Sequence, residues 1–141
     1  MTSVISDELY GRLQDQAGRL CGFCRTSSKI TGQPLTIEHI IPVARGGSSE
    51  EDNLWLSCRR CNEFKGAQLE GVDSETGDSV SLFNPRQQLW HEHFAWSGDG
   101  THIIGLTPAG RATIAALKLN NADIVGARLL WVSVGWHPPE E

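Results

Sequence analysis

Four cysteines in two CxxC pairs constrain the fold of this chain more than any other feature of its sequence. Cys21 and Cys24 form the first pair, Cys58 and Cys61 form the second, and 33 residues lie between the pairs. Two residues between cysteines let a tight turn direct both sulfurs at one ion, and two such turns supply the four thiolates that Zn²⁺ prefers. We therefore expect a structural zinc site. Redox-active CxxC motifs and buried free thiols are the alternatives, although a thioredoxin-like motif would require a βαβ context that we do not find.

The chain between and after the pairs is predicted to form two short strands and a helix. LTIEHIIPV (35–43) is rich in β-branched residues and ends near a proline, which predicts a strand, and NLWLSC (53–58) predicts a second strand. ARGGSSEED (44–52) predicts a loop, and RRCNEFKGAQLEG (59–71) a helix that ends around Gly66. Two strands and one helix are marginal alone, so a zinc ion would supply stability that this small core lacks.

An acidic residue and a histidine, Glu38 and His39, lie side by side in the apolar run of the first strand. With the surrounding pattern CGFC…TIEHIIPVARGGSSEEDNLWLSCRRCNEFKG, they make residues 21–66 resemble the HNH nuclease family, which has a ββα-metal fold. The resemblance covers about a third of the chain and rests on residue types, their order and the framing cysteines. It implies that His39 is the general base and that Glu38, which is more often aspartate in the family, is a metal ligand.

The same resemblance assigns roles to residues near the second cysteine pair. Asn53 matches the asparagine that supports the loop and the base, and Asn62 matches the metal ligand at the start of the helix. Lys65 and Gly66 match the lysine and glycine that usually follow. The family implies 5′-phosphate and 3′-hydroxyl products.

The residue types suit phosphodiester hydrolysis independently of the resemblance. An imidazole with a pKa near neutrality can take a proton from water. A carboxylate and an amide oxygen, those of Glu38 and Asn62, suit Mg²⁺ or Mn²⁺ and leave positions for water and phosphate. Neighbours on a regular strand point to opposite faces, so Glu38 and His39 share one site only if the strand bends or ends there. We expect a metal-dependent DNA endonuclease acting on double-stranded DNA.

The charge distribution bears on the nucleic-acid partner. The net charge of −5 argues against such a partner when taken alone. The half from Gly71 onward, however, carries eight acidic and four basic residues and therefore most of the net negative charge. We expect DNA contacts from Arg45, Arg59, Arg60 and Lys65. A zinc-stabilised nucleic-acid-binding module with weak or no activity is the alternative, and RNA is a further candidate substrate. Cutting both strands would require a homodimer or two visits.

The remainder of the chain completes an α+β fold. SDELYGRLQDQAGRL (6–20) predicts a helix over about 7–19, capped by Ser6 or Asp7. MTSVISDELYGRLQDQ (1–16) lacks the basic and apolar regions of a secretion signal, so we expect none, and no run of apolar residues is long enough for a membrane span. We expect a cytoplasmic protein in which residues 1–70 form the HNH core with this helix and the zinc site. Residues 71–141 form an extension packed on that core, and it resembles an extension of some bacterial, notably cyanobacterial, HNH proteins.

Within the extension we expect a loop, a hairpin and two helices. Residues 70–86 predict a loop that includes Arg86, and HFAWSGDGTHIIGL (93–106) predicts a hairpin around GDG. TPAGRATIAALKLNN (107–121) predicts a helix capped by its first threonine, and ADIVGARLLWVSVGWHPP (122–139) a last helix. In that last helix we place Val125, Leu129 and Val132 on one face. Four tryptophans suit either stacking on bases or a core position, and we favour the core: Trp90, Trp96, Trp131 and Trp136. His91 and His93 suit either metal binding, if they lie on a strand, or an exposed position.

Overall fold

The computed structural model describes residues 5–140, and its internal contacts divide the chain into two compact units. The first unit comprises Met1–Leu69 and Asn84–Gln87, and the second comprises Glu70–Phe83 and Gln88–Glu141. Residues 1–4, which begin the segment in which we expected no secretion signal, and residue 141, which ends the expected extension, lie outside the described residues. No helix of the described part has the length and the apolar character needed to cross a membrane.

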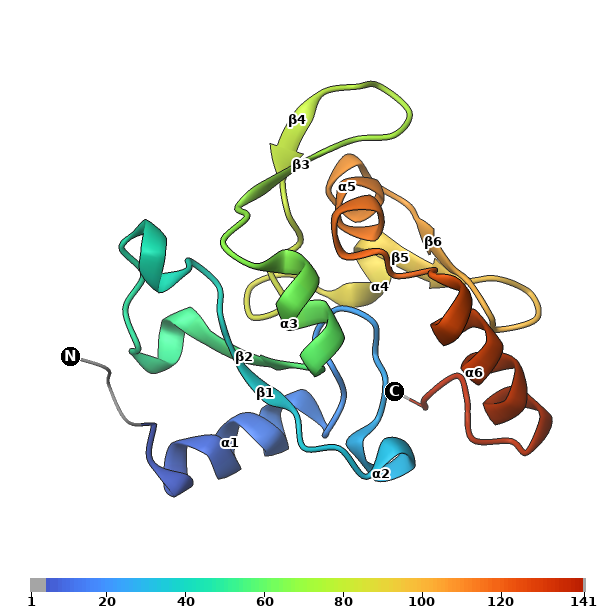
Figure 1. Cartoon of the computed structure of the whole chain (residues 1–141), viewed down its shortest axis with the longest axis horizontal. Coiled ribbons are helices and arrows are strands. Elements are labelled where there is room, and N and C mark those ends of the chain that lie inside the picture. Colours follow the sequence, from blue (N-terminus) through green and yellow to red (C-terminus); the bar gives the residue numbers. More distant parts are fainter. Residues whose placement is uncertain (1–4, 141) are drawn as a thin grey trace. The chain divides into compact units, whose positions relative to one another are not determined.

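A two-stranded antiparallel ribbon with helices packed on it forms the first unit (Figure 1). Its elements in chain order are α1 (Asp7–Ala17), α2 (Ser28–Thr31), β1 (Thr36–His39), the 3₁₀ turns η1 (Val43–Arg45) and η2 (Glu51–Asn53), β2 (Leu54–Ser57) and α3 (Arg59–Lys65). β1 pairs with β2 so that Glu38 lies opposite Trp55 and His39 opposite Leu54. α1 packs against β2, and α3 packs against β1. The expected strand–strand–helix order is confirmed, with shorter strands than the sequence predicted.

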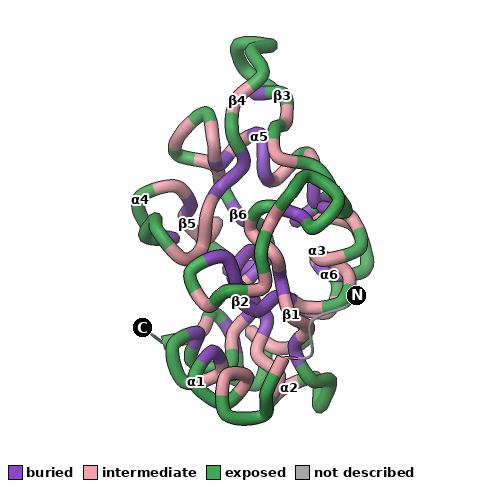
Figure 2. Tube along the Cα trace, turned by 90° about the vertical axis from the view of Figure 1, so that its left-hand side faces the viewer, coloured by how far each residue is buried: buried purple, intermediate pink, exposed green. Residues whose placement is uncertain are grey.

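Local sequence explains the helix boundaries of this unit. The Ser6 hydroxyl caps α1 by accepting a hydrogen bond from the Leu9 N–H at 3.1 Å, and Gly18 ends the helix in the left-handed conformation. Leu13 and Ala17 bury the inner face of α1, and β2 buries Leu54 and Leu56. Figure 2 shows this burial along β2. The core of the unit is small and includes three of the four cysteines.

The second unit contains two hairpins and three helices among the described residues. Its elements are β3 (Glu70–Val72), β4 (Ser79–Ser81), α4 (Trp90–His93), β5 (Phe94–Trp96), β6 (Ile103–Gly105), α5 (Pro108–Leu117) and α6 (Ala122–Ser133). α5 packs against β3, β4 and β6. Thr107 caps α5 and accepts a hydrogen bond from the Gly110 N–H at 3.1 Å, with Pro108 as the first helical residue, as the sequence predicted. The hairpin around GDG is also confirmed, as β5–β6.

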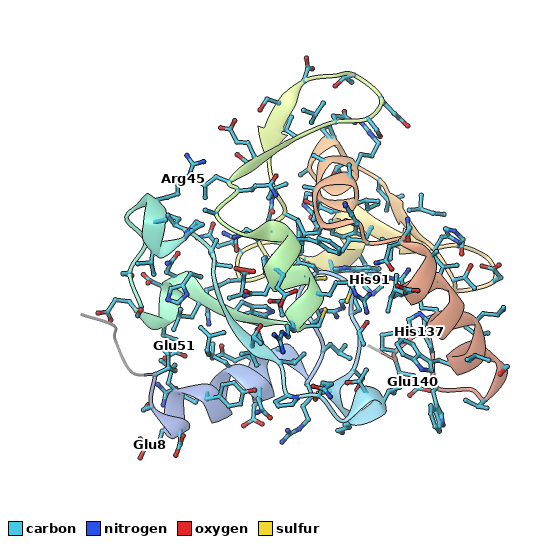
Figure 3. The ribbon with its side chains drawn as sticks, in the orientation of Figure 1. Glu8, Arg45, Glu51, His91, His137 and Glu140 are labelled. Atoms are coloured by element: carbon cyan, nitrogen blue, oxygen red, sulfur yellow. The ribbon has the colours of Figure 1, made fainter. Side chains whose placement is uncertain are left out.

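One expectation for the second unit was wrong, and the structure adds detail to three others. The segment 70–86 is not a loop, because Glu70–Val72 and Ser79–Ser81 pair as a hairpin. The face of α6 that is buried is not the one that carries Leu129: the helix buries Ile124 and Arg128, while Leu129 is 58% exposed. For the histidine pair, the structure agrees with an exposed position and not with a metal site on a strand: both histidines lie on the helix α4, and His91, labelled in Figure 3, is exposed. Of the four tryptophans for which we favoured a core position, Trp90 is buried and Trp136 is 59% exposed.

Candidate functional site

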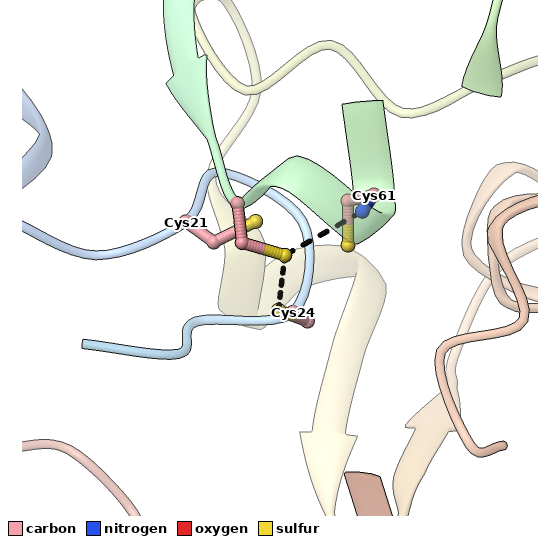
Figure 4. A group of neighbouring side chains, drawn as sticks. Cys21, Cys24 and Cys61 are labelled. Atoms are coloured by element: carbon pink, nitrogen blue, oxygen red, sulfur yellow. Dashed lines mark hydrogen bonds between the residues drawn. The ribbon is translucent and has the colours of Figure 1, made fainter. Parts of the chain in front are cut away.

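The four cysteines converge in the first unit, as Figure 4 shows for Cys21, Cys24 and Cys61. All four Sγ atoms lie within 4.8 Å of one another, and all four cysteines are free of disulfides. The Sγ atoms of Cys24 and Cys58 are 3.7 Å apart, close to the roughly 3.8 Å edge of a tetrahedron built on Zn–S bonds of about 2.3 Å. Among the described residues this is the one cluster of three or more Cys, His, Asp or Glu ligands. The cluster is compatible with zinc.

Main-chain hydrogen bonds shape the two turns that carry these cysteines. In the first turn, the Gly22 N–H donates to the Leu56 carbonyl oxygen at 2.9 Å and so ties the turn to β2. In the second, Cys58 caps α3, and its sulfur accepts a hydrogen bond from the Cys61 N–H at 3.5 Å. Hydrogen bonds from neighbouring thiols hold the pKa of the Cys24 thiol well below its usual range. The cluster therefore joins the segment before β1 to the start of α3.

Asn53 holds the loop that connects β1 to β2. Its Oδ1 accepts a hydrogen bond from the Ile41 N–H at 2.8 Å. Its Nδ2 donates to the carbonyl oxygens of Ile41 at 3.0 Å and Ser48 at 2.7 Å. Gly47 packs into the same place, where an added Cβ would come within 1.7 Å of the Ile41 carbonyl oxygen. Our sequence reasoning missed this glycine, although the pair of glycines in ARGG was a signal for it.

Glu38 and Lys65 form a buried ion pair between β1 and α3. The Lys65 Nζ donates to Glu38 Oε2 and to the carbonyl oxygens of His39 and Ile40, each at 3.3 Å. Both side chains are only 4% exposed. Burial raises the pKa of Glu38 to about 7, and the Lys65 charge opposes that rise. These inward contacts differ from the DNA phosphate contact that we expected for Lys65.

From the sequence, Glu38 and Asn62 are the predicted ligands of a catalytic cation. The atoms in question are the second carboxylate oxygen of Glu38 and the amide oxygen of Asn62. Glu38 Oε1 is buried and has no hydrogen-bond partner among the described residues. Asn62 Nδ2 donates to the Ile37 carbonyl oxygen at 3.1 Å, so the acceptor that remains on this side chain is Oδ1. Asn62 lies one turn before Lys65 on the same side of α3. A buried carboxylate oxygen without a partner and an amide oxygen are the kinds of ligand that a divalent cation such as Mg²⁺ or Mn²⁺ takes.

His39 ends β1, and its ring points to the loop. Its Nε2 lies 3.1 Å from the Ser49 Oγ. Burial and the nearby Lys65 charge lower the pKa of His39 below its ordinary value, which favours the neutral imidazole. Sequence reasoning missed Ser49, and only its place in the loop after the glycine pair marked it. β1 ends at His39, and an end or bend of the strand at this point is what the sequence required if Glu38 and His39 were to share one site.

The arginines with expected DNA contacts lie at the surface or partly buried. Arg45 is exposed at the edge of the loop (Figure 3), and its Nε donates to the Ala67 carbonyl oxygen at 3.2 Å. Arg59 is 85% exposed and pairs with Glu63 at 2.9 Å, and Arg60 is half-buried. Arg86 also belongs to this unit. Its Nε donates to the Leu54 carbonyl oxygen at 2.8 Å, so it supports β2.

Comparison with known proteins identifies the part of the chain that carries this geometry. Residues 21–68 match the family described as HNH endonuclease. No curated protein and no solved structure matches the chain. The matched segment contains β1, β2, α3 and all four cysteines. The family supports a nuclease or nucleic-acid-binding module, a nucleic-acid substrate and use of a divalent metal. Residues 21–68 are therefore an HNH domain with a four-cysteine cluster.

Proposed function

We propose that this protein is a metal-dependent DNA endonuclease that hydrolyses phosphodiester bonds and leaves 5′-phosphate and 3′-hydroxyl ends. The proposal is supported chiefly by one observation. Glu38 is buried with Oε1 unsatisfied within the described residues, on a strand that α3 contacts through Asn62 and Lys65. A buried carboxylate without full partners is costly for a fold and is expected where a cation or a reaction requires it.

The residues around this carboxylate suit distinct roles in hydrolysis. His39 is the proposed general base. If its Nε2–H donates to Ser49 Oγ, Nδ1 keeps the lone pair that takes a proton from water. The lowered pKa of His39 keeps the ring neutral at neutral pH, which a base requires. Asn53 supports the base indirectly, because it fixes the loop from which Ser49 reaches the ring.

Glu38 and Asn62 are the proposed ligands of a catalytic Mg²⁺ or Mn²⁺. When bound, such a cation supplies charge neutralisation at the phosphate and at the departing oxygen. The four cysteines are the proposed ligands of a structural Zn²⁺, in a closed site that leaves no position for substrate. Because Asn62 directly follows the cysteine at position 61, folding around zinc would also position a ligand of the second cation.

Arg45, Arg59 and Arg60 are the proposed contacts to DNA phosphates. They lie in η1 and α3, the elements that follow the strand end carrying His39 and the second cysteine turn. Such contacts position a protein on a duplex without reading its sequence. We propose a cytoplasmic location and double-stranded DNA as substrate, and a homodimer would account for cutting of both strands.

Nicking of supercoiled plasmid by the zinc-loaded protein tests the proposal. We expect nicked circles with Mg²⁺ or Mn²⁺, loss of activity in His39→Ala, and full activity in His102→Ala, which changes an exposed histidine of the second unit. A DNA ligase should reseal the nicks, because only 5′-phosphate and 3′-hydroxyl ends are joined. Parallel assays with single-stranded DNA and RNA define the substrate. Nicking that survives in His39→Ala would refute the role of that residue.

A second candidate is a nucleic-acid-binding module with weak or no activity. The Glu38–Lys65 pair favours it, because an ammonium already neutralises the carboxylate that should hold the cation. This candidate predicts DNA binding by fluorescence anisotropy with no nicking in any divalent metal. Nicking at a rate that depends on His39 excludes it.

A further inference from the structure

Lys65 occupies an unusual position for a basic residue of a DNA-binding surface. It is 3% exposed, and its ammonium has three acceptors, one on Glu38 and two on the main chain at the end of β1. An ammonium carries three protons, so these acceptors use its full donor capacity. Lys65 is therefore fixed beside the carboxylate and is not directed at a ligand outside.

The ion pair sets the charge of the candidate cation site before any ligand arrives. Glu38 contributes one negative charge, Lys65 contributes one positive charge, and Asn62 is neutral. A cation that binds Glu38 through Oε1 shares the carboxylate with an ammonium that binds Oε2. The carboxylate's attraction for a dication is thus largely cancelled, and buried charges are screened little by salt.

We propose that Lys65 makes cation binding at Glu38 and Asn62 dependent on the phosphate of the nucleic acid. This inference rests on the proposed function and adds a regulatory property to the same site. A DNA phosphate supplies the negative charge that the neutral Glu38–Lys65 pair lacks, so the cation and the DNA bind cooperatively. By thermodynamic reciprocity, the cation strengthens DNA binding by the same factor as DNA strengthens cation binding. Lys65 is a positioning residue in this scheme, because it acts through Glu38.

Mn²⁺ titrations with and without DNA test this coupling. The protein is zinc-loaded and carries His39→Ala, so that the DNA remains intact, and free Mn²⁺ is measured by electron paramagnetic resonance at pH 8.0. The probe is a short DNA duplex at saturating concentration. We expect DNA to tighten Mn²⁺ binding at least about tenfold. Even in a water-like dielectric, the single negative charge of a phosphate and the double charge of Mn²⁺ a few ångströms apart attract each other enough to raise affinity by about one power of ten.

Variants of Lys65 separate its charge from its packing. Lys65→Met keeps the length of the side chain without its charge, and we expect Mn²⁺ to bind about tenfold more tightly without DNA, so that Mn²⁺ binding depends less on the DNA. Lys65→Arg keeps the charge and should keep the coupling. Lys29→Met, which removes an exposed lysine of the same unit, should behave as the parent protein. Zinc content and circular dichroism verify that each variant is folded.

Several outcomes would overturn the inference. One is Mn²⁺ binding in the His39→Ala parent that does not change on adding DNA, a result that needs no Lys65 variant. Another is a folded Lys65→Met protein that binds Mn²⁺ no more tightly than this parent in the absence of DNA. These results leave the proposed function intact if the wild-type protein nicks plasmid DNA. Conversely, a protein that couples Mn²⁺ to DNA but never nicks keeps this inference and loses the endonuclease assignment.

Discussion

Asn53 offers the sharpest test of how the loop beside the candidate site is held. Its side chain makes three hydrogen bonds, with the Ile41 N–H, the Ile41 carbonyl and the Ser48 carbonyl. Asn53→Ala removes all three. A hydrogen bond contributes about 1 kcal/mol net, and an unsatisfied group costs about 1–3 kcal/mol more, so we expect a loss of about 2–4 kcal/mol. Asn53→Asp keeps the acceptor but directs a carboxylate at two carbonyl oxygens, and it should be at least as destabilising at neutral pH.

Release of zinc during urea unfolding measures this effect in the right unit. A chromogenic chelator detects the released zinc. The release reports on the first unit, because all four cysteines belong to it. Hydrogen exchange measured by mass spectrometry adds the local view, and residues 40–49 of Asn53→Ala should exchange at least about 30-fold faster if about 2 kcal/mol of local stability is lost. Asn121→Ala is the matched control, since it removes the cap of α6 in the second unit. It should not shift the zinc release.

The reasoning fails if Asn53→Ala releases zinc at the same urea concentration as the wild type and its loop keeps its protection. It also fails if Asn53→Asp is more stable than Asn53→Ala at neutral pH. Lowering the pH should partly rescue Asn53→Asp, because a protonated carboxyl regains one donor. A rescue of equal size in Asn53→Ala would show that the effect has another origin.

Three further outcomes follow from the same unit. Cys58→Ser should lose bound zinc and expose the first unit to limited proteolysis, while fragments of the second unit persist. Because the pKa of Glu38 rises from 4.5 to about 7, the folded metal-free protein holds a proton that the unfolded chain releases. That contribution is full below pH 4.5 and is lost as the pH rises through about 7, by about 3 kcal/mol, and Glu38→Gln should flatten this part of the stability profile. Ser49→Ala should slow nicking about tenfold without loss of zinc, because the His39 ring loses its partner, whereas Ser48→Ala should not.

The first unit was predictable because its signals are local. The CxxC spacings, the glycine that ends α3 and the Ser6 cap each act within a few residues, and each has its expected effect in the structure. The position of Lys65 was not predictable in this way. Its burial depends on carbonyl oxygens at the end of β1, more than twenty residues earlier in the chain, and no spacing rule reports such acceptors.

The second unit shows the same limit. Helical spacing grouped the apolar Leu129 with Val125 and Val132 on one face of α6. The structure instead buries Arg128, whose guanidinium donates to the carbonyl oxygens of Leu119 and Thr101 at 2.7 and 2.9 Å. Those acceptors offset the burial of a charge, and hydropathy alone does not reveal them. The β3–β4 hairpin was missed because its strands are short and polar. Asp73, buried and held by Arg111 at 2.7 Å, organises the turn instead of an Asn-Gly pair.

Glu38 and His39 are neighbours in the chain but lie in different environments, because β1 ends at His39 and the loop to β2 begins there. Glu38 is buried toward Lys65, which leaves its pKa raised, and His39 is half-buried toward Ser49 with its pKa lowered. Near neutral pH the acid therefore retains part of a proton, while the lowered pKa of His39 favours the neutral imidazole. Pairs of titratable groups driven apart in this way are typical of acid–base sites. A divalent cation that replaces the proton on Glu38 would find the neighbouring base already neutral, so both requirements for hydrolysis are met over one pH range. The cation and the proton therefore compete for Glu38. We expect the nicking rate of the wild type to rise with pH through about 7, and the midpoint of this rise to move toward lower pH at higher Mn²⁺ concentration.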